Sequence, residues 1–267
     1  MLQFIAILTV LHLPLVAAKE NSNAGPPVEA PQVKPRIAIV IDDLGHHASN
    51  TAFTELDYPL TLAIMPFSAK AEELATQAYE AGHEVMIHMP MQPESMPAQA
   101  QEVLDLEDTK AQFLATLSAA FSRLPQAQGL NNHQGSLMTA QALQMEWLMD
   151  ALKQRQMYFL DSRTSAATVA EATARQVGIP SNRRHVFLDN DPSLEAIAER
   201  WRRVELIAEN QGYAIVIGHP YPTTLQFLQE LAVKQGSPYE LVYFSELLCL
   251  PDASSKTSNS YCWHPVD

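Results

Sequence analysis

Residues 36–45, RIAIVIDDLG, place two carboxylates directly behind the apolar run Ile37–Ile41. A run that is apolar on both faces is typical of a strand in a parallel sheet covered by helices. In such folds, ligands and catalytic groups gather at the carboxyl ends of the strands. Asp42 and Asp43 therefore stand where a functional site is expected, and Leu44-Gly45 provides a tight exit from the strand.

The same pattern recurs downstream, where short apolar runs alternate with amphipathic segments. The further apolar runs are Leu60–Met65, Glu84–Ile87, Gly129–Asn131, Tyr158–Leu160, Val186–Leu188, Ala214–Ile217 and Leu241–Phe244. The helix-like segments are Ala69–Ala81, Thr109–Leu124, Thr139–Gln154, Thr168–Val177, Pro192–Gln211 and Thr223–Gln235. Strands separated by helices predict an α/β fold with a parallel sheet. Because the composition is uniform and no repeat is visible, we expect one domain wrapped as a barrel or near-barrel.

Six of these runs end in polar residues, which a parallel sheet would deliver to one rim. These residues are Asp42-Asp43, His88, Asn132-His133, Asp161-Ser162-Arg163, Asp189-Asn190-Asp191 and Gly218-His219. Asp and Asn also form turns and cap helices. That role suits Asn190 and Asp191 and leaves Asp189 open, but it does not explain histidines at three strand ends. The rim is therefore predicted to be a functional site.

The residue types at this rim suit a divalent metal. Adjacent residues at a strand end point in different directions, so one carboxylate of Asp42-Asp43 can bind a metal while the other faces its water. His88 and His133 complete a set of two nitrogens and one carboxylate, which leaves positions open for water and substrate. His219 is placed to protonate a leaving group. Zinc suits this set best, although iron, cobalt and manganese fit the same ligands.

Further rim residues are expected to contact substrate. Asp161, Asn132 and Tyr221 lie at or just behind strand ends. Arg163 either pairs with Asp42 and holds it as a charged base, or contacts an anionic substrate. An ion pair that closes the mouth of the barrel is the structural alternative for Arg163.

Five motifs occur in a fixed order along the chain. They are IAIVIDDLG, AGHEVMIHMPM, GLNNHQGS, YFLDSRTS and AIVIGHPYP. Together they resemble the divergent polysaccharide deacetylases, over roughly residues 36–246. The resemblance implies a distorted (β/α) barrel of roughly seven to eight parallel strands, of the polysaccharide deacetylase (NodB-like) type. It further implies that Asp42 is the base, that Asp43 and His88 bind metal, and that His219 is the general acid.

The chain departs from the wider family at one metal ligand. Typical deacetylases place a second histidine four residues after the first, on the same helical turn. Here that position is Gln92, and Pro90 breaks any helix at this point. The third ligand is therefore expected from another strand, and His133 is the candidate.

The two ends of the chain are predicted to lie outside this domain. Residues 1–18 are apolar and end in Val16-Ala17-Ala18, which predicts a cleaved signal peptide; an uncleaved anchor is the alternative. Residues 19–35 indicate a Pro-rich linker, residues 36–248 the barrel domain, and residues 249–267 a C-terminal tail. Cys249 and Cys262 either form a disulfide in an oxidising compartment or remain free thiols.

The charge balance limits the partners. With 17 basic residues against 30 acidic ones, the net charge is -13, which disfavours nucleic acid and anionic membrane surfaces. We expect an exported, periplasmic or cell-envelope protein with no stable membrane span after signal cleavage. Its predicted activity is metal-dependent deacetylation of an N-acetylated envelope polysaccharide or peptidoglycan-like glycan. The alternatives are a non-catalytic barrel that binds glycan or protein, and a metal-dependent hydrolase of other amides or esters.

Overall fold

A computed structural model describes residues 34–95, 102–231, 237–251 and 260–262 of the chain. These residues belong to one compact unit, Lys34–Asp267. The predicted signal peptide and all but the last two residues of the predicted linker lie outside the described residues. None of the described helices is long and apolar enough to cross a membrane.

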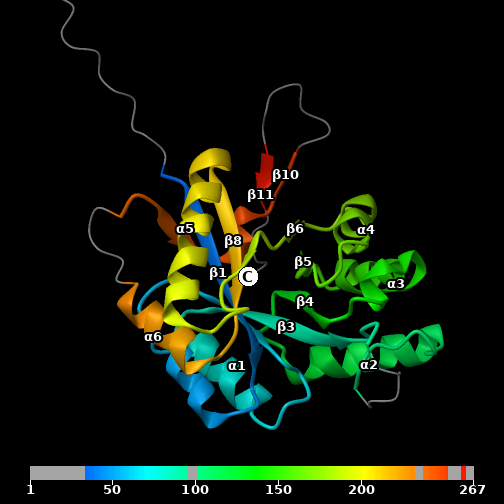
Figure 1. The fold of residues 1–267 in the computed structure, drawn as a ribbon. Helices are drawn as coiled ribbons and strands as arrows, with labels where there is room; N and C mark the ends of the chain where they lie inside the picture. The colour runs from blue at the N-terminus through cyan, green and yellow to red at the C-terminus, as the bar shows by residue number, and fades with distance from the viewer. Residues whose placement is uncertain (1–33, 96–101, 232–236, 252–259, 263–267) are drawn as a thin grey trace, which may run out of the picture. The chain divides into compact units, whose positions relative to one another are not determined.

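A parallel sheet forms the centre of this unit (Figure 1). Its main path runs β6-β5-β4-β3-β2-β1-β8-β7, and β9 pairs with the first residues of β1. The strands are β1 (Arg36–Leu44), β2 (Thr61–Ile64), β3 (Glu84–Met91), β4 (Gly129–Gln134), β5 (Tyr158–Asp161), β6 (Ser181–Arg183), β7 (Val186–Phe187), β8 (Tyr213–Gly218) and β9 (Glu240–Val242). The predicted fold class is confirmed: the sheet curls into a half-barrel of parallel strands, and the end strands β6 and β7 do not pair with each other.

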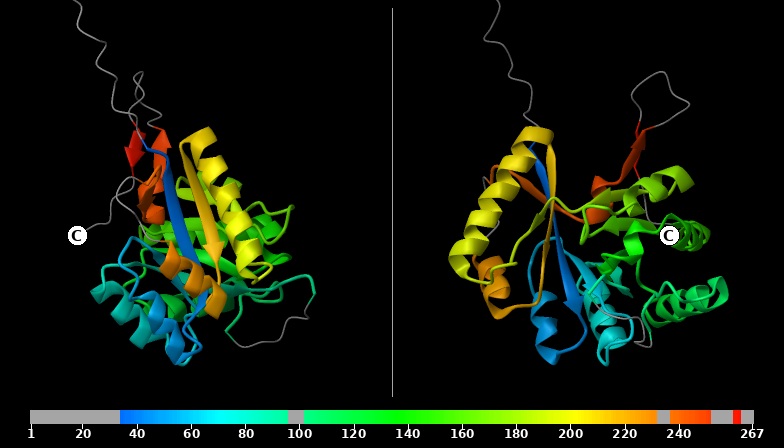
Figure 2. Two further views of the ribbon diagram at one scale, coloured as in Figure 1. Left: turned by 60° about the vertical axis from the view of Figure 1, so that its left-hand side comes forward. Right: turned by 45° about the vertical axis from the view of Figure 1, so that its right-hand side comes forward.

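Helices cover the outer face of the curled sheet (Figure 2). They are α1 (Ala71–Glu80), α2 (Lys110–Arg123), α3 (Ala142–Gln154), α4 (Ala170–Val177), α5 (Leu194–Gln211) and α6 (Pro222–Glu230). The short 3₁₀ helices are η1 (Ala48–Phe53), η2 (Met138–Ala140) and η3 (Phe244–Leu247), and η3 packs on the inner face. Local sequence sets their ends. The hydroxyl of Thr109 accepts a hydrogen bond from the backbone N–H of Gln112 at the start of α2. Gly212 ends α5 in the left-handed conformation, with φ of 87°.

Two apolar clusters divide the side chains of the strands. Ile37, Ile39 and Ile41 of β1 belong to the outer cluster beneath the helices. Ala38 and Val40 belong to an inner cluster on the other face of the sheet. Since side chains alternate along a strand, the next inward position after Val40 is Asp42. The same alternation places His88 two residues after Met86, and His219 two residues after Ile217, on the inner face.

The exit from β1 is tightly fixed. The pairing of β1 with β2 shifts register between Ile41 and Leu44, and Asp43 has a φ of 57°. Gly45 follows, and a Cβ at this position would lie 2.2 Å from Oγ of Ser68. The backbone N–H of Gly45 donates to Oδ1 of Asn50, 3.0 Å away. This exit redirects Asp43, so both neighbouring carboxylates reach the rim.

A buried polar group closes the opposite end of the inner face. Glu84 begins β3 and is 5% exposed. Its Oε1 accepts hydrogen bonds from the hydroxyl of Thr61 (2.7 Å) and the backbone N–H of Ser245 (3.3 Å). The backbone N–H of Phe244 donates to the same Thr61 hydroxyl at 3.0 Å. Glu84 and Thr61 thereby fasten η3 to the amino ends of β2 and β3.

Beyond the sheet, β10 (Cys249–Pro251) pairs with β11 (Ser260–Cys262) in an antiparallel ladder. Its register places Cys249 opposite Cys262. A disulfide between them stays a prediction.

Candidate active site

Three predicted metal ligands converge at the carboxyl ends of β1, β3 and β4. Oδ1 of Asp43 lies 3.0 Å from Nε2 of His88 and 2.8 Å from Nδ1 of His133. The two ring nitrogens are 3.1 Å apart. Among the described residues, Asp43, His88 and His133 form the one group of three or more His, Cys, Asp and Glu side chains compact enough to hold a metal ion.

The second nitrogen of His88 is held by a polar chain. Nδ1 of His88 lies 2.7 Å from Oδ1 of Asn131, whose Nδ2 donates to Oδ1 of Asp42 at 2.8 Å. Because the amide oxygen of Asn131 can only accept, Nδ1 of His88 carries the proton of this contact. To bind a cation, His88 would give up the Nε2 proton that it donates to Asp43, and Nε2 would then offer its lone pair to the ion. Metal-binding histidines are typically oriented through the other ring nitrogen in this way, so the donor set fits a divalent cation.

The two aspartates occupy different electrostatic environments. Burial raises the pKa of Asp42, although His88, His219 and the hydrogen bond from Asn131 act against it. Burial also acts to raise the pKa of Asp43, but the hydrogen bonds from His133 and His88 outweigh it and hold that pKa well below its usual range. Asp42 is therefore the more basic carboxylate, and Asp43 is the permanently charged one.

His219 is oriented by a buried carboxylate. Its Nδ1 lies 2.7 Å from Oδ1 of Asp189, and its backbone N–H donates to Oδ2 of the same residue at 2.6 Å. The hydroxyl of Thr224 also donates to that Oδ2. Burial acts to lower the pKa of His219, but the hydrogen bond and charge of Asp189 outweigh it, and the pKa is raised. The raised pKa favours the protonated imidazole, in which Nε2 carries a proton that it can give up.

One alternative for Arg163, an ion pair with Asp42, is not found among the described residues. The backbone N–H of Arg163 donates to Oδ1 of Asp161 at 2.8 Å, and its φ is 50°. Contact of Arg163 with an anionic substrate stays a prediction. Arg184 is the cation that interacts with Asp42: burial and Arg163 lower its pKa to about 10, while Asp42 and Asp161 act to raise it.

The other predicted substrate contacts take mixed positions. Asn132 is buried, and its Oδ1 accepts from the backbone N–H of Ser162 while its Nδ2 donates to the carbonyl of Gln134. Asp161 is likewise buried and accepts from the hydroxyl of Thr168. Both side chains therefore brace the rim loops. Tyr221 is 43% exposed, and its ring lies 5.9 Å from that of His219.

Two residues of the site are not predicted from the sequence: Asn131 and Arg184. Asp189 directly follows the run Val186–Leu188, as Asp42 follows Ile37–Ile41, so the sequence places it on the rim but leaves its role open. Asn131 lies inside the run Gly129–Asn131, which predicts a strand and no site residue. Arg184 lies between two short strands, and its Nε and Nη2 donate to the carbonyls of Ser162 and Arg163. No sequence pattern predicts these two hydrogen bonds.

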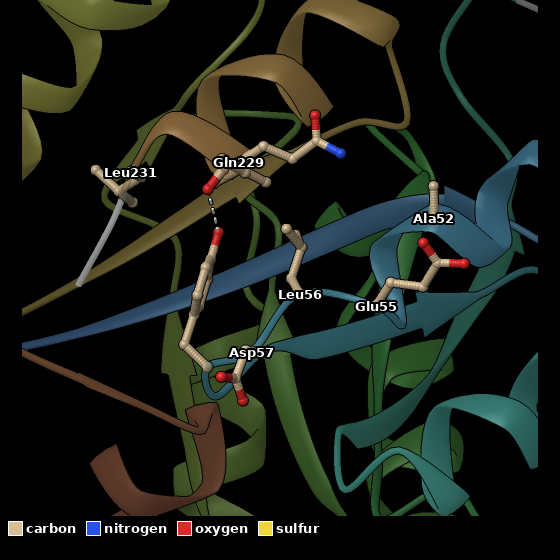
Figure 3. A pocket seen from close by; sticks show the side chains of 8 residues that line it. Ala52, Glu55, Leu56, Asp57, Gln229 and Leu231 are labelled. Carbon is tan, nitrogen blue, oxygen red and sulfur yellow. Dashed lines mark hydrogen bonds between the residues drawn. The ribbon is translucent and has the colours of Figure 1, made fainter.

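Two cavities differ in their relation to this site. One of about 320 Å³ includes His133 in its wall. Another, of about 380 Å³, lies between η1 and α6 and contains none of the site residues (Figure 3). In its wall, the hydroxyl of Tyr58 donates to the carbonyl of Leu228 at 2.9 Å. The first cavity alone of these two adjoins the candidate metal ligands.

Comparisons with known proteins agree with this fold and identify a family. Residues 39–248 match the family model described as divergent polysaccharide deacetylase. The chain is 34% identical over 231 residues to the uncharacterized protein YibQ of Escherichia coli (strain K12), covering 86% of this chain and 72% of the relative. It is 36% identical over 195 residues to an uncharacterized protein of Haemophilus influenzae, covering 73% and 70%.

A solved structure shows the same fold. The uncharacterized protein ATU2773 of Agrobacterium tumefaciens C58 superposes with a TM-score of 0.74 at 21% identity, covering 80% of this chain and 88% of that one. At this identity the likeness concerns the fold alone. The family match covers most of the chain and includes every residue of the candidate site. The chain therefore belongs to the divergent polysaccharide deacetylase family.

Proposed function

We propose that this protein is an exported, metal-dependent hydrolase that deacetylates an N-acetylated polysaccharide of the cell envelope. The observation that carries the proposal is the convergence of Asp43, His88 and His133 beside the buried carboxylate of Asp42. The carboxylate oxygen Oδ2 of Asp42 lies 3.7 Å from Nδ1 of His88. A ligand set and a base of raised pKa thus occupy one rim.

The chain's own groups would divide the work. Asp43, His88 and His133 would hold the cation, most suitably zinc. A divalent cation held there supplies polarisation of the acyl carbonyl and activation of a water molecule. Asp42, the more basic carboxylate, accepts the proton of the attacking water. His219, kept protonated by Asp189, donates a proton to the departing amine.

The test is release of acetate from N-acetylglucosamine oligomers by zinc-loaded protein. We expect turnover in the native protein and a loss of about 10²- to 10⁴-fold in kcat for Asp42→Asn, which keeps the size and removes the base. Removal of the metal should abolish turnover. Activity that survives both changes would overturn the proposal. Binding of the oligomers without turnover in the zinc-loaded native protein would instead favour a glycan-binding barrel.

Export is the second part of the proposal, and it rests on the apolar residues 1–18 with their small-residue exit. Expression of the full chain in a Gram-negative host should yield a periplasmic protein that begins at Lys19. An intact amino terminus in the cytoplasmic fraction would contradict it.

A further inference from the structure

The cavity beside His133 is mainly apolar. It measures about 320 Å³ and is walled by Met65, Phe67, Pro90, Met91 and Val103, with the polar residues His46, Ser68, Glu102, His133 and Gln134 around them. One of the polar groups is already engaged, since the hydroxyl of Ser68 donates to the carbonyl of Met65 at 2.8 Å. The cavity therefore offers more apolar contact than hydrogen bonding. That suits a hydrocarbon group better than a sugar ring.

Its size exceeds what an acetyl group needs. A cavity of about 150 Å³ is large enough to take up benzene. The cavity beside His133 has roughly twice that volume. A single methyl group would leave most of its apolar wall in contact with water.

The order of strands tells which part of a substrate this cavity faces. The rim runs β4-β3-β2-β1-β8. His219 follows β8, whereas the cavity is lined by residues of β3 and β4 and of the segments behind β1 and β2. The metal ligands come from β1, β3 and β4. If His219 protonates the departing amine, the amine lies toward β8 and the acyl side of the substrate lies toward the cavity.

We infer that the acyl groups that this protein accepts extend beyond acetyl to longer aliphatic chains, and that the pocket of Met65, Phe67 and Val103 receives these chains. The assignment of the acyl side rests on the proposed hydrolase function, because it uses the roles of His219 and the metal ligands. Occupation of the pocket itself is measurable without turnover.

The test is calorimetric titration of the full zinc-loaded chain with glucosamine, N-acetylglucosamine and N-hexanoylglucosamine. Each methylene that is fully buried strengthens binding by up to about fourfold. Four extra methylenes, partly buried in an open pocket, should therefore make the hexanoyl compound bind at least about tenfold more tightly than the acetyl compound. Equal affinities for the two acyl sugars, or no binding of the hexanoyl compound, would overturn the inference. So would glucosamine binding as tightly as the hexanoyl compound, because the sugar ring would then be the occupant.

Two pocket variants and one control distinguish binding in the pocket from non-specific hydrophobic binding elsewhere on the protein. Val103→Trp fills the pocket and should bring the ratio of hexanoyl to acetyl affinity close to one. Phe67→Ala removes a wall and should lower the same ratio without adding bulk. Leu143→Trp adds the same large side chain at an exposed position of α3 outside the pocket and should leave the ratio unchanged. A ratio that is the same in all four proteins would contradict the inference.

Turnover distinguishes this inference from the function on which it rests. In one outcome, the pocket variants abolish a preference for the hexanoyl compound while no acyl group is released by the native protein. That result would contradict the hydrolase function and support the pocket as an acyl-binding site. Release of acetate with no preference for longer chains would retain the hydrolase and overturn the pocket assignment.

Discussion

Asp42 and Asp43 are neighbours in the chain with opposite shifts in pKa. Asp42 continues the inward alternation of β1, is 2% exposed, and has a raised pKa because burial disfavours its charge. Asp43 turns out of the strand at φ 57° and meets two imidazoles, whose hydrogen bonds hold its pKa low. One strand end thus supplies both the proposed base and the proposed anionic ligand.

The imidazole of His219 provides a prediction of pH dependence. Asp189 raises its pKa, so the protonated form persists to higher pH than in an ordinary histidine. Asp189→Asn removes the negative charge, and the pKa of His219 should fall. NMR titration of the His219 ring would show this directly, and the alkaline limb of kcat/KM should move to lower pH by the same amount. Thr224→Val, which removes one hydrogen bond to Asp189 without changing its charge, is the control and should cause a smaller shift. An unchanged ring titration in Asp189→Asn would contradict this role.

Asn131 provides a prediction about metal affinity. Its amide orients His88 and at the same time donates to Asp42. Loss of such an orienting partner typically weakens metal binding about 10- to 100-fold. Asn131→Ala should show this loss in a chelator competition assay. The matched control is Asn132→Ala, since the side chain of Asn132 forms hydrogen bonds with Gln134, Thr164 and Ser162 in the rim loops. Equal metal affinities in the two variants would contradict the role of Asn131 in orienting His88.

At the residue scale, the sequence predicts the site residues that directly follow a strand. It does not predict residues such as Asn131, which contribute by forming hydrogen bonds to other site residues. Asp42, Asp43, His88, His133 and His219 all follow apolar runs, so strand order alone places them on one rim. Of the alternatives left open for Arg163, pairing with Asp42 is not found among the described residues, and contact with substrate stays a prediction. The electrostatic influence of Asp42 on Arg184 joins residues far apart in the sequence, so no local pattern predicts it.

At the scale of elements, the long third strand decides which ligand set is possible. β3 runs through Pro90 to Met91, so Gln92 lies behind a strand and not on a helical turn with His88. Pro90 is paired with His133 in the register of β3 with β4. The third candidate ligand, His133, consequently lies on the neighbouring strand. The apolar run Glu84–Ile87 predicted the start of β3, but its extension through HMPM depends on pairing with β4, which local sequence does not reveal.

Short strands show the same limit. β6 (Ser181–Arg183) was not predicted, because SNR carries no apolar run and the strand exists through its pairing with β5. The helices were predicted within a few residues of their ends, apart from the end of α6, since amphipathic spacing and caps are local signals. Elements whose formation is determined by local sequence were therefore predictable. The strand β6, which forms by pairing with another strand, was not.

The fastening of η3 to the sheet provides a prediction at this scale. Burial raises the pKa of Glu84, so the folded protein binds a proton that the unfolded chain releases near pH 4.5. The stabilising contribution of this proton is fully present below that unfolded value and is lost as the pH rises through the higher folded pKa. Glu84→Gln keeps the acceptor for Thr61 and removes the titration. The free energy of unfolding of Glu84→Gln, measured with urea as the pH is raised from below 4.5 through the folded pKa of Glu84, should not decline as that of the native protein does. Parallel pH profiles for the two proteins would contradict this assignment.

At the scale of the whole folded unit, the inner face of the sheet has a cluster of polar side chains at each end of the strands. The amino ends of the strands hold Glu84 and Thr61 beneath η3, and the carboxyl ends hold the candidate active site. The strands between them are apolar on both faces, which gives the site a rigid base. The candidate active site thus lies at one rim, and the contacts at the opposite end hold η3 on the sheet.

The central claim is that Asp43, His88 and His133 form a metal site. The most direct measurement is anomalous diffraction from crystals of the full chain grown with zinc. We predict one zinc ion per chain at this rim, with Oδ1 of Asp43, Nε2 of His88 and Nδ1 of His133 each about 2.0–2.2 Å from the ion. A rim without an ion in zinc-saturated crystals, or an ion held by other residues, would contradict the account.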